Sequence, residues 1–134
     1  MTNRILKTSI GAVLIVSMMF LAKVEAGGQG LPPNWWLMSK AKPIHSMAEF
    51  NTLMDGELKN KFVFIDFYME HCPWCYYILD DLNRLIEDMN HWYGPEKVEV
   101  LKIDGERIKS LSSKYSVQSY PHFIAIAPNS GGKL

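Results

Sequence analysis

The sequence predicts an α/β fold in which a central sheet is flanked by helices. Short apolar runs alternate along the chain with longer stretches whose apolar residues recur every three or four positions. Turns that contain glycine or proline separate these segments. The chain has 134 residues, which is enough for one domain with a modest core.

Three helices are predicted in this pattern. Ser46 and Glu49 form a capping box ahead of the first helix, which Asp55-Gly56 weakens or ends. A second helix runs from Cys72 to about Trp92, and a short third helix covers residues 106–115. The inward-facing residues of the first two helices are Phe50, Leu53, Met54, Leu58, Tyr76, Leu79, Leu82, Leu85, Ile86 and Met89. We expect these residues, together with Phe123, to form much of the core.

Three strands are predicted, at residues 61–68, 98–104 and 122–127. The first is apolar at nearly every position, so we expect it to be central and covered on both faces. Asp66 interrupts this run, and its apolar neighbours favour burial with a raised pKa over a solvated edge position. A short strand near Ile44 would complete a small sheet. The order of strands and helices predicts parallel pairing at the start of the sheet.

The N-terminus has the layout of a targeting segment. Basic residues precede a short apolar run, and small residues follow near position 26, which is typical of a secretory signal peptide over residues 1–26. The alternative is a membrane anchor retained at residues 8–24, although the apolar run is shorter than the roughly 20 residues that a spanning helix needs. We expect entry into the secretory pathway, to the endoplasmic reticulum lumen or the cell exterior, with membrane anchoring as the alternative.

Residues 27–44 are rich in glycine and proline, so they are predicted to be an irregular lead-in to a domain at residues 45–134. Trp35 and Trp36 within the lead-in are expected to pack onto the domain. The chain carries 14 basic and 14 acidic side chains, a formal net charge of zero. This balance offers no electrostatic basis for binding nucleic acid.

The two cysteines of the chain lie together in Cys72-Pro73-Trp74-Cys75. They stand where a predicted strand leads into a predicted helix, a position typical of a thiol–disulfide redox motif. An inert pair of buried small side chains is the plain alternative. A zinc site that adds His71 and His122 is conceivable, but adjacent His71 and Cys72 would bind one metal poorly. We therefore predict redox chemistry and no metal or other cofactor.

Three segments in this order resemble the thioredoxin family, most closely its secretory, protein-disulfide-isomerase-like branch. The first runs from Ile65 to Cys75 and contains an acid ahead of the cysteine pair. The second is the strand that ends at Asp104, and the third runs from Lys114 to Pro121. The resemblance spans residues 62–127 and implies a thioredoxin-like fold.

The resemblance also implies roles for individual residues. Cys72 would be the exposed attacking thiol and Cys75 the resolving thiol, joined as a redox disulfide when oxidised. Asp66 would be the buried acid that helps to move the proton of Cys75. Pro121 would be cis and lie against the cysteine pair, and the backbone of Tyr120 would hydrogen-bond an extended substrate.

Trp74 is predicted to contact peptide or unfolded protein substrates at the rim of the site, or else to pack against Trp92 or Tyr68. His71, which stands where the family commonly has tryptophan, could favour the Cys72 thiolate or be a plain surface residue. The family fold continues with one more strand and a terminal helix that this sequence, which stops at Leu134, does not show. Their absence would leave apolar surface bare, so either the sequence is truncated, the N-terminal segment covers this face, or a partner does.

These observations predict a thiol–disulfide oxidoreductase that exchanges disulfides with protein or peptide thiols. The alternative is a thioredoxin-like docking subunit of a larger assembly, which could be bound to a membrane. The direction of the redox reaction does not follow from the residues.

Overall fold

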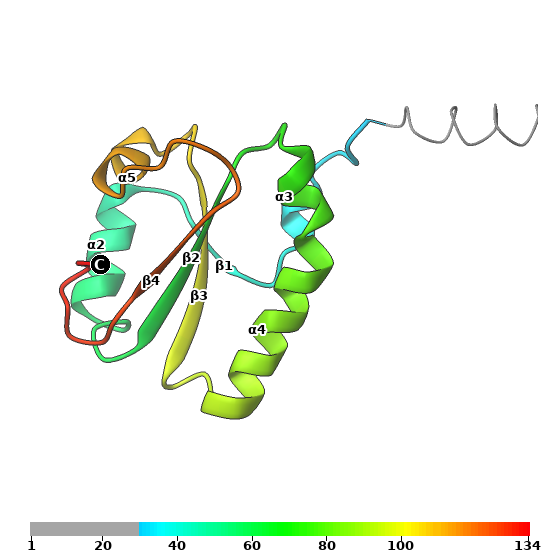
Figure 1. Cartoon of the computed structure of the whole chain (residues 1–134). Helices are drawn as coiled ribbons and strands as arrows, with labels where there is room; N and C mark the ends of the chain where they lie inside the picture. Colours follow the sequence, from blue (N-terminus) through cyan, green and yellow to red (C-terminus); the bar gives the residue numbers. More distant parts are fainter. Residues whose placement is uncertain (1–29) are drawn as a thin grey trace, which may run out of the picture. The chain divides into compact units, whose positions relative to one another are not determined.

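Four strands form one mixed sheet in the order β1–β3–β2–β4 in the computed structural model, which describes residues 30–134. β1 (Lys42–Ile44) and β2 (Phe62–Tyr68) each pair in parallel with β3 (Val98–Asp104). β4 (His122–Ile126) runs antiparallel to β2. The predicted strands and the parallel start of the sheet are thus confirmed, and β2 is central as expected (Figure 1). The predicted signal peptide lies outside the described residues.

Helices cover both faces of this sheet (Figure 1). α2 (Met47–Asp55) and α5 (Lys109–Lys114) lie on one face, over the larger part of the core. α3 (Pro73–Tyr77) and α4 (Leu79–Tyr93) lie on the other, where Leu82 and Ile86 pack with Ala41 and Val100. Within residues 30–134, no helix is long and apolar enough to cross a bilayer.

The described part of the lead-in is more regular than its composition predicts. A turn of 3-10 helix, η1 (Trp35–Met38), precedes β1, which is the short strand expected near Ile44. Trp35 is buried, and Ile44 belongs to the larger core cluster. The prediction of an irregular segment over residues 27–44 was therefore wrong at 35–38, while the strand at 42–44 is the one expected near Ile44. The reason is that sheet pairing and one buried indole override the local preference of glycine and proline for loops.

The first helix begins at the predicted capping box. The Ser46 hydroxyl accepts the Glu49 N–H at 3.0 Å, and the Glu49 carboxylate reaches back to the N–H of His45 at 2.7 Å. These bonds satisfy two backbone donors that a helix start leaves free. α2 ends at Asp55, and Gly56 follows as its C-cap.

The second predicted helix is broken into α3 and α4 at Ile78, without a proline. The N–H of Ile78 bonds to the Trp74 and Tyr76 carbonyls, while the Ile78 carbonyl accepts the Leu82 N–H and so starts the next helix. The break shortens α3 to a single turn and keeps the two cysteines at its beginning. The third predicted helix is also shorter, as α5 begins only at Lys109.

Two residues expected in the core are exposed. Leu85 on α4 is 42% exposed and Phe123 on β4 is 40% exposed. They line an apolar groove of about 270 Å³ together with Phe64, Ile78, Asp81 and Leu82. The outer edge of β4 pairs with no strand of residues 30–134, and no helix or strand of that range follows β4. This groove leaves apolar side chains of α4 and β4 exposed among the described residues.

Candidate active site

The candidate active site lies at the end of the sheet where β2 finishes. β2 ends at Tyr68, and three residues separate it from Cys72. β4 starts at this same end, because His122 pairs with Phe67 in the antiparallel register. The bond between Tyr120 and Pro121, directly before β4, is cis as expected. The sheet therefore brings the cysteine motif and the Tyr120-Pro121 turn to one end of the molecule.

Cys72 and Cys75 are joined by a disulfide. Cys72 is the N-cap of α3, with extended backbone dihedrals, and Pro73 follows at the first helical position, where a missing N–H costs nothing. The Cys72 sulfur accepts the Cys75 N–H at 3.1 Å. A donor held against this sulfur would also stabilise a thiolate after reduction.

Cys72 is not the exposed residue that we expected. Its exposed fraction is 2%, and that of Cys75 is 4%. The reason is that its sulfur turns inward, to the Cys75 sulfur and to the N–H that it accepts. The exposed side chain of the motif is Trp74, at 69%, and its ring meets Tyr77 edge to face at 5.8 Å. Trp74 thus forms no aromatic pair with Trp92 or Tyr68 in the described residues.

Asp66 is the buried acid that the sequence predicts. It lies on β2 at 6% exposure, and its Oδ1 has no hydrogen-bond partner among the described residues. Burial raises the pKa of Asp66 from 3.8 to about 7, against a smaller lowering by the positive charge of Lys102. A carboxyl group with this pKa can hold or release a proton near neutral pH.

Lys102 is a site residue that sequence reasoning missed. It lies opposite Asp66 in the β2–β3 register and is itself buried. Its ammonium group donates to the Trp36 carbonyl at 2.7 Å and to the Ser39 carbonyl at 3.1 Å. Burial lowers the pKa of Lys102, and the Asp66 charge opposes that shift. One signal could have found it, which is a lysine that stands between Leu101 and Ile103 in a predicted strand next to that of Asp66.

The remaining predicted residues stand around the motif. His71 is exposed, and His122 is half-buried with its ring against Phe67 at 6.4 Å. The Tyr120 ring lies so close to Gly105 that any side chain there would collide with it. No cluster of three or more His, Cys, Asp or Glu within residues 30–134 could hold a metal ion.

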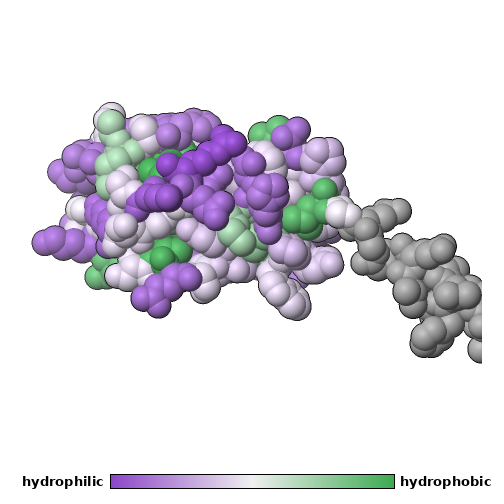
Figure 2. Space-filling view, turned by 90° about the horizontal axis from the view of Figure 1, so that it is seen from above, coloured by the Kyte–Doolittle hydropathy of each residue, from purple (hydrophilic) through white to green (hydrophobic). Residues whose placement is uncertain are grey.

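Figure 2 shows the face that lies at the top in Figure 1. Hydrophilic and hydrophobic residues are interspersed on this face, and the hydrophobic residues form small separate groups. A partner that approaches from this side meets polar and apolar groups together.

Comparison with known protein families matches residues 42–133 to the family described as Thioredoxin. The chain belongs to the thioredoxin family. The match contains the cysteine motif, Asp66, Lys102 and the cis-proline turn. It begins after η1, so Trp35 and Trp36 lie outside the matched residues.

Relatives of known name are thioredoxins as well. The chain is 30% identical over 79 residues to the chloroplastic thioredoxin Y of Oryza sativa subsp. japonica. The aligned residues make up 59% of this chain and 43% of the relative. It is 27% identical over 86 residues to thioredoxin-1 of Drosophila yakuba, covering 64% of this chain and 75% of the relative. The matched part thus spans less than half of the rice protein and three quarters of the fly protein.

Solved thioredoxins share this fold. A thioredoxin from Fasciola hepatica superposes with a TM-score of 0.56 at 26% identity, over 66% of this chain and 78% of that one. A thioredoxin from Nicotiana alata superposes with a TM-score of 0.57 at 19% identity, over 77% and 81% of the two chains. The second likeness shows the thioredoxin-like fold alone.

Proposed function

We propose that this thioredoxin-family protein is a thiol–disulfide oxidoreductase that acts on protein substrates. The observation that carries the proposal is the disulfide between Cys72 and Cys75, whose first sulfur accepts the Cys75 N–H, in a chain that also buries Asp66. A structural disulfide over so short a loop would add little stability, because it removes little conformational entropy from the unfolded chain. The pair is better suited to exchange than to holding the fold together.

In the reductive direction, the Cys72 thiolate attacks one sulfur of a substrate disulfide. A bond forms between Cys72 and that sulfur, and the second substrate sulfur leaves as a thiolate that takes a proton from water. Cys75 then loses its proton and attacks the Cys72 sulfur. The mixed disulfide breaks, the Cys72–Cys75 bond forms, and the first substrate sulfur leaves as a thiolate. The protein dithiol gives up two electrons, and the substrate disulfide gains them.

Asp66 is the base proposed for the proton of Cys75. Its pKa of about 7 suits a group that must accept a proton from a thiol and return it near neutral pH. Its Oδ1, which has no partner among the described residues, is free to accept this proton directly or through one water molecule.

Substrate binding is assigned to Trp74 and to the turn at Tyr120 and Pro121. Trp74 offers an exposed aromatic ring beside the reactive sulfur, and aromatic rings bind many side chains with little loss of entropy. The turn leads into β4 at the same end of the sheet, so its backbone can pair with an extended substrate strand.

We further propose that the protein works in the secretory pathway, as a disulfide-isomerase-like member of the family. The basic and apolar pattern over residues 1–26 supports this location, with a membrane anchor at 8–24 as the alternative. Mass spectrometry of the protein isolated from its cell would test it. A first residue near Gly27 supports cleavage, and an intact N-terminus contradicts it.

The activity is tested by reduction of insulin with dithiothreitol as the electron source. The full chain should accelerate insulin precipitation, and Cys72→Ser should return the rate to that of dithiothreitol alone. Trp92→Phe is a suitable control, because Trp92 is exposed on α4. An equal rate with the full chain and with Cys72→Ser would refute exchange through Cys72. If exchange through Cys72 is observed, the equilibrium of the Cys72–Cys75 pair with glutathione gives the favoured direction of the redox reaction.

The exposed apolar groove favours a second candidate, a docking subunit of a larger assembly. Phe64 and Phe123 stack at 5.5 Å in this groove, on the neighbouring strands β2 and β4, and the other edge of β4 pairs with no strand of the described residues. This candidate predicts that a Cys72→Ser, Cys75→Ser chain still supports function in the cell, while Phe123→Thr does not. The reverse result favours the oxidoreductase.

A further inference from the structure

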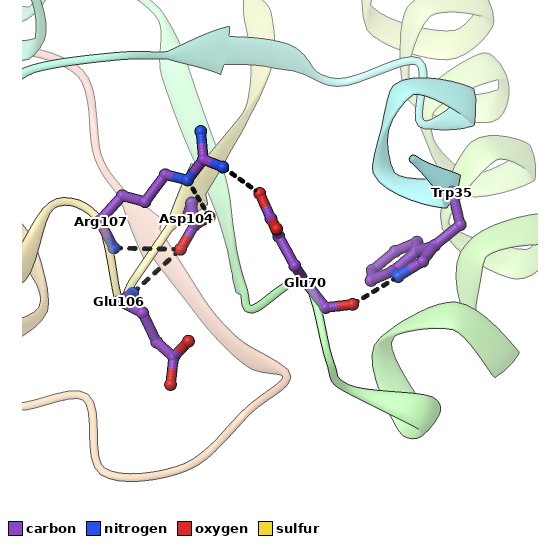
Figure 3. Close-up of polar contacts among 5 residues, drawn as sticks. All are labelled: Trp35, Glu70, Asp104, Glu106 and Arg107. Carbon is purple, nitrogen blue, oxygen red and sulfur yellow. Dashed lines mark hydrogen bonds and ion pairs between the residues drawn. The ribbon is translucent and has the colours of Figure 1, made fainter. Parts of the chain in front are cut away.

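Trp35 connects the η1 turn to the loop that leads to Cys72. Its indole is 3% exposed, and its Nε1–H donates to the Glu70 carbonyl at 2.8 Å (Figure 3). The ring also meets the Tyr68 and Tyr76 rings edge to face, with centroids 5.8 and 6.0 Å apart. Trp35 therefore contacts the residues before and after the cysteine motif as well as the loop itself.

Glu70 is held from its other side by Arg107. The Glu70 carboxylate forms an ion pair with the Arg107 guanidinium, whose Nε lies 3.4 Å from Asp104 Oδ2 (Figure 3). Asp104 Oδ1 in turn accepts the backbone N–H groups of Glu106 and Arg107 at 3.0 and 3.1 Å. The Asp104 turn at the end of β3 thus fixes the arginine that holds the Glu70 side chain.

These contacts leave the loop between Tyr68 and Cys72 little freedom. The Tyr68 carbonyl accepts the Gly105 N–H at 2.9 Å, the Glu70 carbonyl accepts the indole of Trp35, and the Cys72 carbonyl accepts the Tyr76 N–H at 3.2 Å. Of these three bonds, the Glu70 bond is the one whose donor is a side chain. A single substitution can therefore remove it and leave the backbone network in place.

We propose that Trp35 is a positioning residue for Cys72, because its indole N–H fixes the Glu70 carbonyl and thereby the loop that places the Cys72 sulfur against the Cys75 N–H. The inference rests on the proposed exchange at Cys72, but its geometry comes from η1, outside the residues matched to the family. Trp35 touches no reacting atom and acts through Glu70.

The expected effect of losing the Trp35 donor is a less stable Cys72 thiolate. The Cys75 N–H, which contacts the Cys72 sulfur at 3.1 Å in the disulfide, would also stabilise a Cys72 thiolate as long as the backbone at Cys72 keeps its position. Without the indole bond the loop can shift, the thiolate loses part of this interaction, and less of it is present at a given pH. A rise of one unit in the Cys72 pKa would reduce the thiolate about tenfold at pH values below both pKa values.

The test compares Trp35→Phe with Trp36→Phe in the full chain. Phenylalanine at 35 keeps an aromatic ring and removes the donor, while Trp36, on the same 3-10 turn, contacts Lys102 through its backbone carbonyl. The pH profile of iodoacetamide alkylation of Cys72 should shift upward in Trp35→Phe, with alkylation about threefold to tenfold slower near neutral pH. The Trp36 ring packs edge to face on Trp35 at 6.1 Å, and Trp36→Phe keeps an aromatic ring there and the indole donor of Trp35, so it should keep the wild-type profile. A Trp35→Phe profile equal to wild type, with only a lower unfolding midpoint, would overturn the proposal.

A second measurement needs no substitution at Trp35. The indole N–H signals of Trp36, Trp74 and Trp92 can be assigned in nitrogen-15 spectra by replacing each with phenylalanine, which leaves the signal of Trp35. This signal should be protected from solvent exchange and should shift when the disulfide is reduced. Rapid exchange and an unchanged position would contradict the inference. The first measurement follows the Cys72 thiol and the second the Trp35 indole, and neither needs activity, so inactivity on insulin would refute the proposed function without deciding the role of Trp35.

Discussion

Lys102 lies directly opposite Asp66 on the neighbouring strand, yet its ammonium group donates to the Trp36 and Ser39 carbonyls. No ion pair joins the two side chains among the described residues, and Asp66 Oδ1 has no partner there. The lysine therefore influences the acid through its field, while its hydrogen bonds hold the end of η1 against the sheet. One buried cation serves both the electrostatics of the site and the attachment of the N-terminal segment.

Replacing Lys102 with methionine should raise the pKa of Asp66 above about 7, because the positive charge that lowers it is lost. The same change leaves two carbonyls without their donor, which should lower the free energy of unfolding by about 1–3 kcal/mol. Carbon-13 titration of the carboxyl group measures the first effect, and urea unfolding the second. Lys97→Met, an exposed control, should alter neither. An unchanged Asp66 titration would show that Lys102 does not act on it.

Asp66→Asn should change how stability depends on pH. The folded pKa of Asp66 lies above the unfolded value, so the carboxyl group contributes its full stability below about pH 4 and loses it as pH rises through about 7. The shift corresponds to about 4 kcal/mol above pH 7. The asparagine variant, which cannot ionise, should be more stable than wild type at pH 8 and similar to it at pH 4. Urea unfolding at both pH values measures the difference, and parallel curves would contradict a raised pKa.

The same substitution should slow the second chemical step. Without the carboxylate, Cys75 loses its proton acceptor, so the mixed disulfide should resolve about tenfold more slowly or worse. The measurement is release of a chromogenic thiol from a preformed Cys72 mixed disulfide, followed from pH 6 to 9. Wild type should show an inflection near pH 7, and Asp66→Asn should lack it. If the inflection persists in the variant, another group supplies it.

Trp74→Ala should affect substrates and leave the fold intact. Its ring is 69% exposed, so the free energy of unfolding should change by less than about 0.5 kcal/mol. The KM for insulin should rise severalfold, because the exposed ring no longer contacts the polypeptide, while alkylation of Cys72 by a small reagent should stay the same. Trp92→Ala is the matched control, being 75% exposed on α4. An equal rise of the KM in both variants would point to a general surface effect.

The apolar groove should bind a hydrophobic dye in the native protein. Leu85 and Phe123 line it and are each about two-fifths exposed, so anilinonaphthalene sulfonate should fluoresce with the folded chain. The double variant Leu85→Gln, Phe123→Thr should lose most of this signal and keep its unfolding midpoint within a few degrees. Undiminished fluorescence in the variant would place the dye elsewhere.

The strands were predictable because each is a short run in which apolar residues predominate, bounded by turn residues. The capping box at Ser46 and the buried position of Asp66 also followed from neighbouring residues, since both depend on short-range chemistry. The break at Ile78 did not, because no glycine or proline marks it and only the hydrogen bonds reveal it. Leu85 and Phe123 were misplaced because periodicity identifies an apolar face without showing whether anything covers it.

The candidate site divides in the same way. Cys72, Cys75 and the Tyr120-Pro121 turn form recognisable motifs, whereas Lys102 and Trp35 act through partners about 30 to 70 positions away in the chain. Such contacts depend on how the sheet and η1 pack together, and the local sequence pattern does not predict that packing. The inward turn of the Cys72 sulfur was missed for a similar reason, because exposure is set by packing and not by position in the motif.

The placement of Trp35 has a practical consequence for anyone who trims this protein. A recombinant domain cut to the family boundaries would begin at residue 42 and would leave out η1. Such a fragment would retain both cysteines and every strand, and it would pass as a complete redox domain by motif. It would nevertheless present Lys102 without its carbonyl acceptors and Glu70 without its indole donor. Its measured potential would belong to the fragment and not to the protein.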